Sequence, residues 1–110
     1  MSKPLPPEYF DLAKVREMLA EPTSWCKLYY QHGYQICLDQ AVIAVAAARD
    51  IHWSEPYSRA TWLLLEAAEG HKRHRYGSVV SFNDHHHTTH ADVLAVIDRA
   101  MGLAVERAHA

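Results

Sequence analysis

The segment from Cys37 to Ala48, with the sequence CLDQAVIAVAAA, constrains the fold more than any other part of the chain. Between Ala41 and Ala48 it contains no polar residue. A helix of this composition is apolar on every side and needs protein around it. It is too short to cross a bilayer, which takes about 20 apolar residues. We therefore predict a central apolar helix over residues 37–48, with the other elements packed around it.

The overall composition is ordinary for a globular chain. It has 110 residues, of which 49% are hydrophobic and 22% charged, and its net charge is −2. This length predicts one globular domain over residues 1–110, with residues 1–7 as a flexible lead-in. The small negative charge disfavours nucleic acid or an anionic membrane as a partner. Because the sequence shows no export signal and no membrane-spanning run, the predicted compartment is the cytoplasm, where both cysteines are expected to stay reduced.

Apolar periodicity and end signals predict three further helices. Pro6-Pro7 suits a helix start, and Pro22 ends that helix near Ala20 or Glu21. Ser54-Glu55-Pro56 predicts the start of another helix, which Gly70 would end. The last helix begins at the capping box formed by Thr89 and Asp92 and continues to about Arg107. The predicted fold class is mainly α (α+β): about four helices, built around the apolar helix 37–48, with one small β-hairpin near residues 25–36.

The predicted hairpin is the only paired β structure that the sequence indicates. The aromatic stretch 25–31 would form its first strand and residues 34–36 its return. His32 and Gly33 would form the two-residue turn, so that Gln31 faces Tyr34.

Several short motifs resemble a known family. Trp25 followed by a turn, ICLDQA at Ile36–Ala41, and SFNDHHHTTHADVLAVIDRA at Ser81–Ala100 resemble the pattern of a small uncharacterised domain family. That family occurs in actinobacteria and their phages and is catalogued as a domain of unknown function. Its pattern maps onto Trp25, Cys37 with Ala41, Phe82-Asn83-Asp84, and Thr89 with Val93.

The chain departs from the family pattern in two places. Gln40 stands where the family has a glycine, and the triple histidine at 85–87 is additional. The resemblance implies a small intracellular accessory protein of phage or actinobacterial origin. It implies no activity that can be transferred to this chain.

The histidine-rich segment DHHHTTH, residues 84–90, is the candidate metal site. Imidazole and carboxylate groups suit zinc, and the candidate ligands are Asp84, His86, His87 and His90. The alternative is a solvated polar loop before the last helix. It is favoured because no HExxH or CxxC motif is present. Consecutive histidines are also not expected to converge easily on one ion.

A catalytic reading of the same segment has a structural alternative. Asp84 could orient a histidine as a general base. The alternative is that Asn83 and Asp84 shape a turn after a short extended segment at 79–82. Because no motif marks a nucleophile, no catalytic residue is assigned, and no cofactor is predicted apart from the zinc alternative. A non-catalytic role is favoured, with a metal- or histidine-dependent enzyme centred on Asp84–His90 as the alternative.

The run HKRHRY, residues 71–76, is the one dense basic feature. Its cations could contact phosphates while its tyrosine stacks on a base. The alternative is a solvated helix end, where cations are favoured by the helix dipole. We prefer the second reading, because the net charge is −2 and no helix-turn-helix is recognisable.

Tyrosine and tryptophan residues suggest the function. A core that already contains an all-apolar helix cannot bury all of them, and exposed Tyr and Trp are enriched at protein interfaces. We therefore predict a non-catalytic protein that binds an unidentified host or phage protein, with a homodimer through the last helix as a variant. The predicted partner-binding residues are Trp25, Tyr29, Tyr30, Tyr34, Lys72, Arg73, Arg75 and Tyr76.

Overall fold

Residues 4–49 and 54–109 are described by a computed structural model. This part of the chain holds five α-helices and one short hairpin, which confirms a mainly α fold with a small β part. The side chains of residues 49 and 54–58 also lie outside the description. In chain order the elements are α1 (Pro7–Met18), the 3-10 helix η1 (Pro22–Ser24), β1 (Gln31–His32), β2 (Gln35–Ile36), α2 (Leu38–Arg49), α3 (Ser54–Lys72), α4 (Val79–Asp84) and α5 (His90–Ala108).

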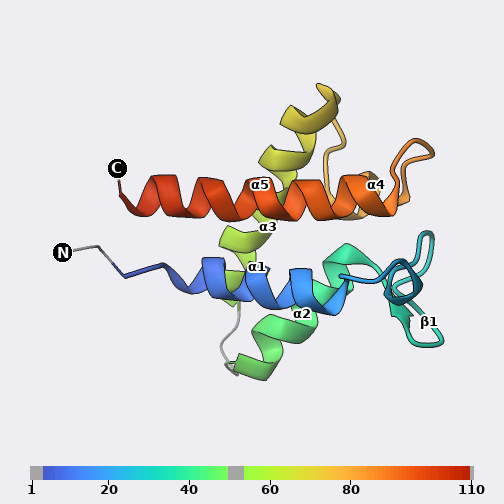
Figure 1. The fold of residues 1–110 in the computed structure, drawn as a ribbon, viewed down its shortest axis with the longest axis horizontal. Coiled ribbons are helices and arrows are strands. Elements are labelled where there is room, and N and C mark those ends of the chain that lie inside the picture. Colours follow the sequence, from blue (N-terminus) through green and yellow to red (C-terminus); the bar gives the residue numbers. More distant parts are fainter. Residues whose placement is uncertain (1–3, 50–53, 110) are drawn as a thin grey trace.

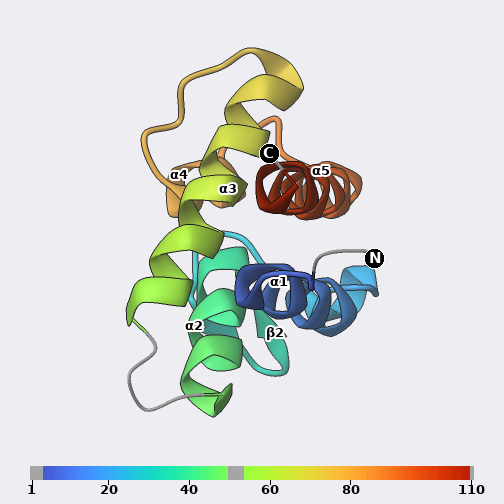
Figure 2. The ribbon, with the colours of Figure 1, turned by 90° about the vertical axis from the view of Figure 1, so that its left-hand side faces the viewer.

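Helix α3 is the central element of the bundle. In Figures 1 and 2, α1 and α5 lie side by side and run in opposite directions, while α3 crosses both of them. Helix α3 contacts each of the other four helices. Its buried residues, Ala60, Leu63, Leu64, Ala67 and Ala68, form one continuous core with apolar residues of α1, α2, α4 and α5.

The expectation that residues 41–48 are surrounded on every side is wrong. Helix α2 buries Ala41, Val42, Val45 and Ala46, but Ala47 and Ala48 are exposed. An alanine exposes little apolar surface, so an uninterrupted apolar sequence does not require burial at each position. The helix therefore packs by one face.

The last helix is the most completely predicted element. The Thr89 hydroxyl accepts a hydrogen bond from the Asp92 amide at 3.2 Å, and the Asp92 carboxylate accepts one from the Thr89 amide at 2.9 Å. This confirms the capping box. The apolar face of α5 is buried inside the chain and consists of Val93, Val96, Ile97, Ala100 and Ala104.

Two predictions about the middle of the chain are wrong. Residues 79–82, expected to be extended, belong to the short helix α4, whose first turn is capped by the Ser78 hydroxyl accepting from the Ser81 amide at 3.1 Å. Helix α3 does not end at Gly70 but continues to Lys72, and Arg73 follows with φ +52°. A Cβ on Gly70 would lie 2.8 Å from the Arg99 guanidinium, the far end of a flexible side chain that a larger residue at position 70 would displace.

Helices α1 and α3 begin where the sequence predicts, but α1 ends earlier than predicted. Helix α1 begins at Pro7 as expected and ends at Met18, two to three residues before the predicted end. Helix α3 begins at Ser54 as expected, and the proposed cap by the Ser54 side chain lies outside the described residues.

The hairpin is present, but its register differs from the predicted one. Gln31 pairs with Ile36 and His32 with Gln35, so the loop residues are Gly33 and Tyr34. Gly33 has φ +63° at the first loop position, where a tight turn of the II′ kind needs a positive φ. His32 is therefore a strand residue.

Both cysteines are free and buried. Burial raises the pKa of the Cys26 and Cys37 thiols, which keeps them protonated and poorly reactive. None of the helices in the described ranges is both long and apolar enough to cross a membrane.

Candidate functional site

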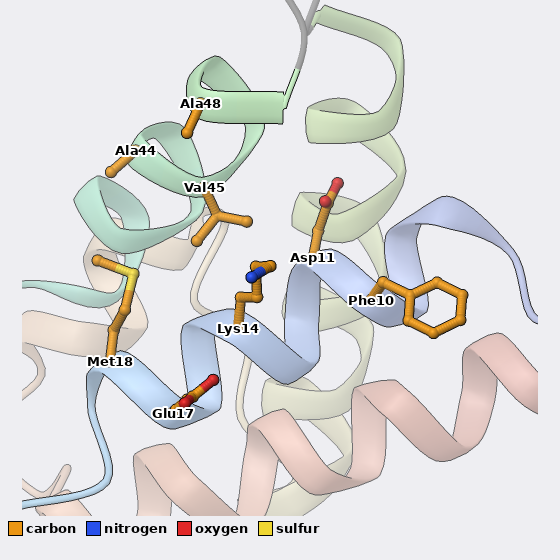
Figure 3. Close-up of a pocket in the computed structure, with 8 residues that line it drawn as sticks. All are labelled: Phe10, Asp11, Lys14, Glu17, Met18, Ala44, Val45 and Ala48. Atoms are coloured by element: carbon orange, nitrogen blue, oxygen red, sulfur yellow. The ribbon is translucent and has the colours of Figure 1, made fainter.

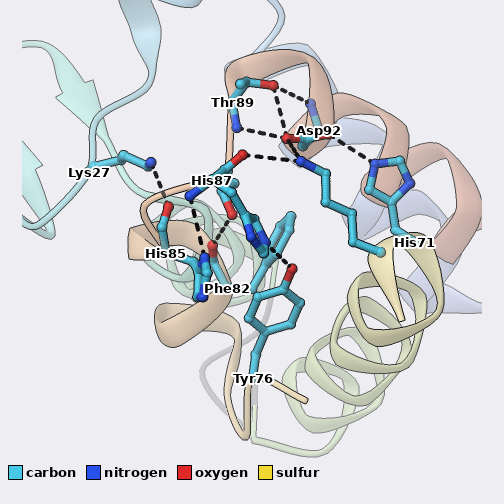
Figure 4. Close-up of polar contacts among 10 residues, drawn as sticks. Lys27, His71, Tyr76, Phe82, His85, His87, Thr89 and Asp92 are labelled. Atoms are coloured by element: carbon cyan, nitrogen blue, oxygen red, sulfur yellow. Dashed lines mark hydrogen bonds and ion pairs between the residues drawn. The ribbon is translucent and has the colours of Figure 1, made fainter. Parts of the chain in front are cut away.

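The basic run, which begins in the last turn of α3, and the histidine triplet before α5 form one polar cluster. The Tyr76 hydroxyl lies 2.6 Å from Nε2 of His87 (Figure 4). Lys72 donates a hydrogen bond to the main-chain oxygen of His87 at 3.1 Å. The His74 ring lies 4.8 Å from the His85 ring between centroids. Two features that are separate in the sequence are therefore neighbours in the fold.

A tight turn over residues 85–88, here called the histidine turn, sets the geometry of this cluster. Helix α4 ends where His85 adopts an extended conformation, and the Thr88 amide then donates to the His85 carbonyl at 2.9 Å. The buried Thr88 hydroxyl donates to the Phe82 carbonyl at 2.7 Å. Lys27 donates to the His85 carbonyl at 2.6 Å, so the turn is also held by a segment distant in sequence.

The histidine turn brings its three imidazoles together. One ligand nitrogen from each of His85, His86 and His87 lies within 4.8 Å of the others. The rings of His85 and His87 are 3.7 Å apart between centroids. The turn places the rings of residues 85 and 87 on the same side of the backbone, so these imidazoles lie close together although they are nearly consecutive in the sequence.

The neighbourhood keeps two of these imidazoles neutral. Partial desolvation lowers the pKa of His85, and the nearby His87, His86 and His74 lower it further. Partial desolvation also lowers the pKa of His87, with added repulsion from Lys72. A neutral imidazole has one ring nitrogen whose lone pair can accept a proton or bind a metal ion. In His85, Nδ1 accepts a hydrogen bond from the His87 amide at 3.4 Å.

We expect the free energy of unfolding to decrease as the pH falls from 7 to 5. An unfolded histidine titrates near 6.5, whereas the pKa values of folded His85 and His87 lie lower. In that interval the unfolded chain binds more protons, so acid favours unfolding. Urea unfolding at several pH values measures this, and the decrease should be smaller in the double variant His85→Asn, His87→Asn. Identical pH profiles for the two proteins would contradict the assignment.

Asp92 anchors the other edge of the cluster. Its carboxylate lies 3.0 Å from the Lys72 ammonium and 3.0 Å from Nε2 of His71 (Figure 4). Burial alone would raise the pKa of this carboxyl, but hydrogen bonds from Thr89, Lys72 and His71 hold it well below its usual range. Asp92 therefore stays ionised and ties the end of α3 to the start of α5.

The metal ligands predicted from the sequence do not form one group. His86 and His87 lie together, but Asp84 accepts hydrogen bonds from the Leu28 amide at 2.8 Å and from the Asn83 side chain at 2.9 Å. Nε2 of His90 lies 2.6 Å from the carbonyl oxygen of Leu19. Within the described residues, the hydrogen bonds of Asp84 go to Leu28 and Asn83. None of these bonds orients a histidine as a general base.

Asn83 is a buried connector, which corrects its predicted role in a local turn. Its side-chain oxygen accepts from Nε1 of Trp25 at 2.6 Å and from the Leu38 amide at 3.0 Å. Its amide group donates to the Cys26 carbonyl at 3.0 Å. Asn83 is completely buried, and it joins α4 to both ends of the segment that carries the hairpin.

An exposed apolar surface, here called the aromatic hairpin, covers residues 28–34. Leu28, Tyr29 and Tyr30 expose 73%, 60% and 62% of their surface, and Tyr34 at the tip is fully exposed. Trp25, also predicted as a contact residue, is only partly exposed and is bonded to Asn83.

The predicted partner-binding residues fall on two separate surfaces. Figures 1 and 2 place the end of α3 on one side of α5 and the hairpin on the other, towards α1 and α2. In the basic run, Arg73 and Arg75 are exposed. Lys72 is paired with Asp92, and Tyr76 is buried against Phe82.

A groove of about 740 Å³ lies between α1 and α2 (Figure 3). Met18, Ala44 and Val45 give it an apolar lining, with Lys14 and Glu17 also contributing. The buried Asp11 lines it as well, so the groove combines apolar and charged side chains.

The comparison with known families agrees with the motifs seen in the sequence. A family model described as a family of unknown function (DUF6197) matches residues 6–103. The chain belongs to this family. No curated protein and no solved structure matches it.

The match to DUF6197 covers the aromatic hairpin, the Asn83 connector and the histidine turn. The family carries no assigned activity, so the function has to be argued from these sites. An actinobacterial or phage origin stays a prediction. His74, His85 and Lys27 were missed as site residues, because only the folded chain brings them together.

Proposed function

We propose that this DUF6197 protein is a small accessory protein that binds another protein without catalysing a reaction. The aromatic hairpin is its contact surface. The basic run is not part of this surface, because it lies at the far end of α3. The apolar face of α5 is also not used, because it is buried within the chain.

The backbone conformation of Leu28 is the observation that carries this proposal. Leu28 has φ +69°, which is uncommon for a residue with a side chain and costs about 1 kcal/mol or more. The Leu28 amide is held in place by Asp84, and the side chain is 73% exposed to solvent. This conformation presents a leucine to water beside exposed tyrosines, which supports a role in recognition.

The neighbouring tyrosines extend the same surface. Tyrosine supplies a large apolar area at a low entropic cost and is enriched among residues that dominate binding energy. The hairpin is already ordered: the Cys37 amide donates to the Tyr30 carbonyl at 3.0 Å, and the Cys26 amide donates to the Ile36 carbonyl at 3.2 Å. A preorganised surface loses little conformational entropy on binding.

The shape of the hairpin selects the kind of partner. Tyr34 is fully exposed at the tip, whereas Leu28, Tyr29 and Tyr30 line a hollow of about 560 Å³. The partner we propose is therefore a different protein, which places an apolar side chain in this hollow and an apolar surface against Tyr34. Two copies meeting tip to tip would bury too little area for a stable dimer. A tip inserted into the α1–α2 groove of another copy would be a head-to-tail contact, which continues into longer assemblies or rings.

Affinity capture from a lysate of the source organism tests the proposal with a matched variant. We expect one stoichiometric partner, and about 30-fold or more weaker binding by the variant Tyr29→Ala, Tyr30→Ala, Tyr34→Ala. The control is Trp62→Ala, which removes an aromatic side chain that is 70% exposed on α3 and should leave binding unchanged. Equal capture by the triple variant, no partner at all, or self-association in sedimentation that the triple variant abolishes would each contradict it.

A further inference from the structure

The geometry of the histidine turn points to a metal site, which is independent of the aromatic hairpin. We propose that the protein binds one divalent transition-metal ion, of the zinc, cobalt or nickel class, through His85, His86 and His87. His74 supplies a fourth imidazole. This ligand set shares only His86 and His87 with the one predicted from the sequence.

The distances between the imidazoles are close to those of a metal site. Zinc–nitrogen bonds of about 2.0–2.1 Å place tetrahedral ligand nitrogens about 3.4 Å apart. In the histidine turn the three nitrogens already lie within 4.8 Å of one another. Small side-chain rotations, of about 1 Å at each nitrogen, would bring them to bonding distance.

His74 reaches the same place from the segment that follows α3. Its ring centroid is 4.8 Å from that of His85 and 5.7 Å from that of His87. The left-handed conformation of Arg73 ends α3, and the His74 amide then donates to the Glu69 carbonyl at 3.3 Å. A ligand from a distant segment raises the number of available imidazoles from three to four.

The backbone of the turn is fixed before any ion binds. Lys27 holds the His85 carbonyl, Lys72 holds the His87 carbonyl, and Thr88 holds the end of α4. Little ordering is therefore required on binding, which favours affinity. The charge of Lys72 is offset by the ion pair with Asp92, so it repels an incoming cation less.

Tyr76 gives His87 the kind of support that metal-bound histidines usually have. The hydroxyl lies 2.6 Å from Nε2 of His87, which orients the ring and leaves Nδ1 for a metal ion. Imidazole nitrogens suit zinc, cobalt, nickel and copper, whereas calcium and magnesium require oxygen ligands.

Asp84 and His90 are not part of this site. Asp84 is bonded to Leu28 and Asn83, and His90 is bonded to the Leu19 carbonyl. Using either as a ligand would break contacts that hold the hairpin segment or the end of α1. The two ligand sets therefore make different predictions for single substitutions.

The test is a Co²⁺ titration of full-length, metal-free protein that carries no histidine tag. The visible absorption of Co²⁺ reports its coordination, and equilibrium dialysis with Zn²⁺ gives the stoichiometry. We expect one ion per chain, with binding about tenfold or more weaker in His86→Ala. His86 is exposed, so this variant should fold normally. His74→Ala should weaken binding and alter the cobalt spectrum.

Exposed histidines elsewhere provide the controls. His32→Ala and His109→Ala remove comparable imidazoles and should leave the affinity unchanged. Loss of binding in these controls equal to that in His86→Ala would show adventitious surface binding and overturn the proposal. The same conclusion follows if wild-type protein binds no stoichiometric ion, or if Asp84→Asn abolishes binding in a folded protein while His86→Ala does not.

Discussion

Replacement of Asn83 by alanine is expected to reduce the free energy of unfolding by about 4 kcal/mol. The substitution leaves three buried or partly buried groups without a partner: the Trp25 indole nitrogen, the Leu38 amide and the Cys26 carbonyl. An unpaired buried polar group costs about 1–3 kcal/mol, and a cavity adds to that cost. Urea unfolding followed by circular dichroism measures the change.

The control for Asn83→Ala is Gln31→Ala, which removes an exposed side-chain amide that donates to the Gly33 carbonyl at 3.2 Å. Its effect should stay within about 0.5 kcal/mol. Asn83→Asp preserves the shape but replaces the group that donates to Cys26, so it should be as harmful as alanine. If Asn83→Ala unfolds at the same urea concentration as the wild type, Asn83 does not connect the hairpin segment to the core.

Leu64→Ala is expected to cost about 3 kcal/mol, because it opens a cavity where α3 crosses the bundle. Leu64 is completely buried and belongs to the core shared by all five α-helices of the described chain. Thermal and urea unfolding should both report the loss. Trp62→Ala on the same helix removes a larger but 70% exposed side chain and should cost far less.

Ala47→Glu distinguishes the observed fold from the one predicted for α2. Ala47 is exposed, so the charge would remain in water and the stability should change by about 0.5 kcal/mol or less. A helix surrounded on every side would instead have to bury an unpaired carboxylate, at a cost of several kcal/mol. If Ala47→Glu destabilised the protein strongly and Leu64→Ala did not, α2 rather than α3 would be the central helix of the bundle.

The features predicted correctly from the sequence are those set by local contacts. Thr89 and Asp92 lie three residues apart and satisfy each other's main chain, so the start of α5 follows from the sequence. The segment at 79–82 was misread because Val79, Val80 and Phe82 favour strands, and six residues are too few to show a helical period. The hairpin register depended on where Gly33 places its positive φ, which composition does not specify.

The candidate sites depend on contacts between distant segments, which spacing does not reveal. Asn83 reaches residues 25 and 38, and the histidine turn meets His74 and Lys27. The residue types are informative, since the cluster of histidines and the number of tyrosines are both unusual for a chain of this size. Spacing does not reveal their partners, because these come from the contacts of α4 and the histidine turn with the segment that carries the hairpin, and of His74 with the histidine turn.

The long axis of the bundle, 42 Å in extent, determines how this protein can be attached to a surface. The first turn of α1 and the last turn of α5 lie at one end of that axis, and the aromatic hairpin and the histidine turn lie at the other (Figure 1). A tether or a fluorescent fusion joined beyond either of these helix ends would therefore point away from both proposed sites. Immobilised molecules would present the tyrosines and the imidazoles outward, ready for measurement of either ligand.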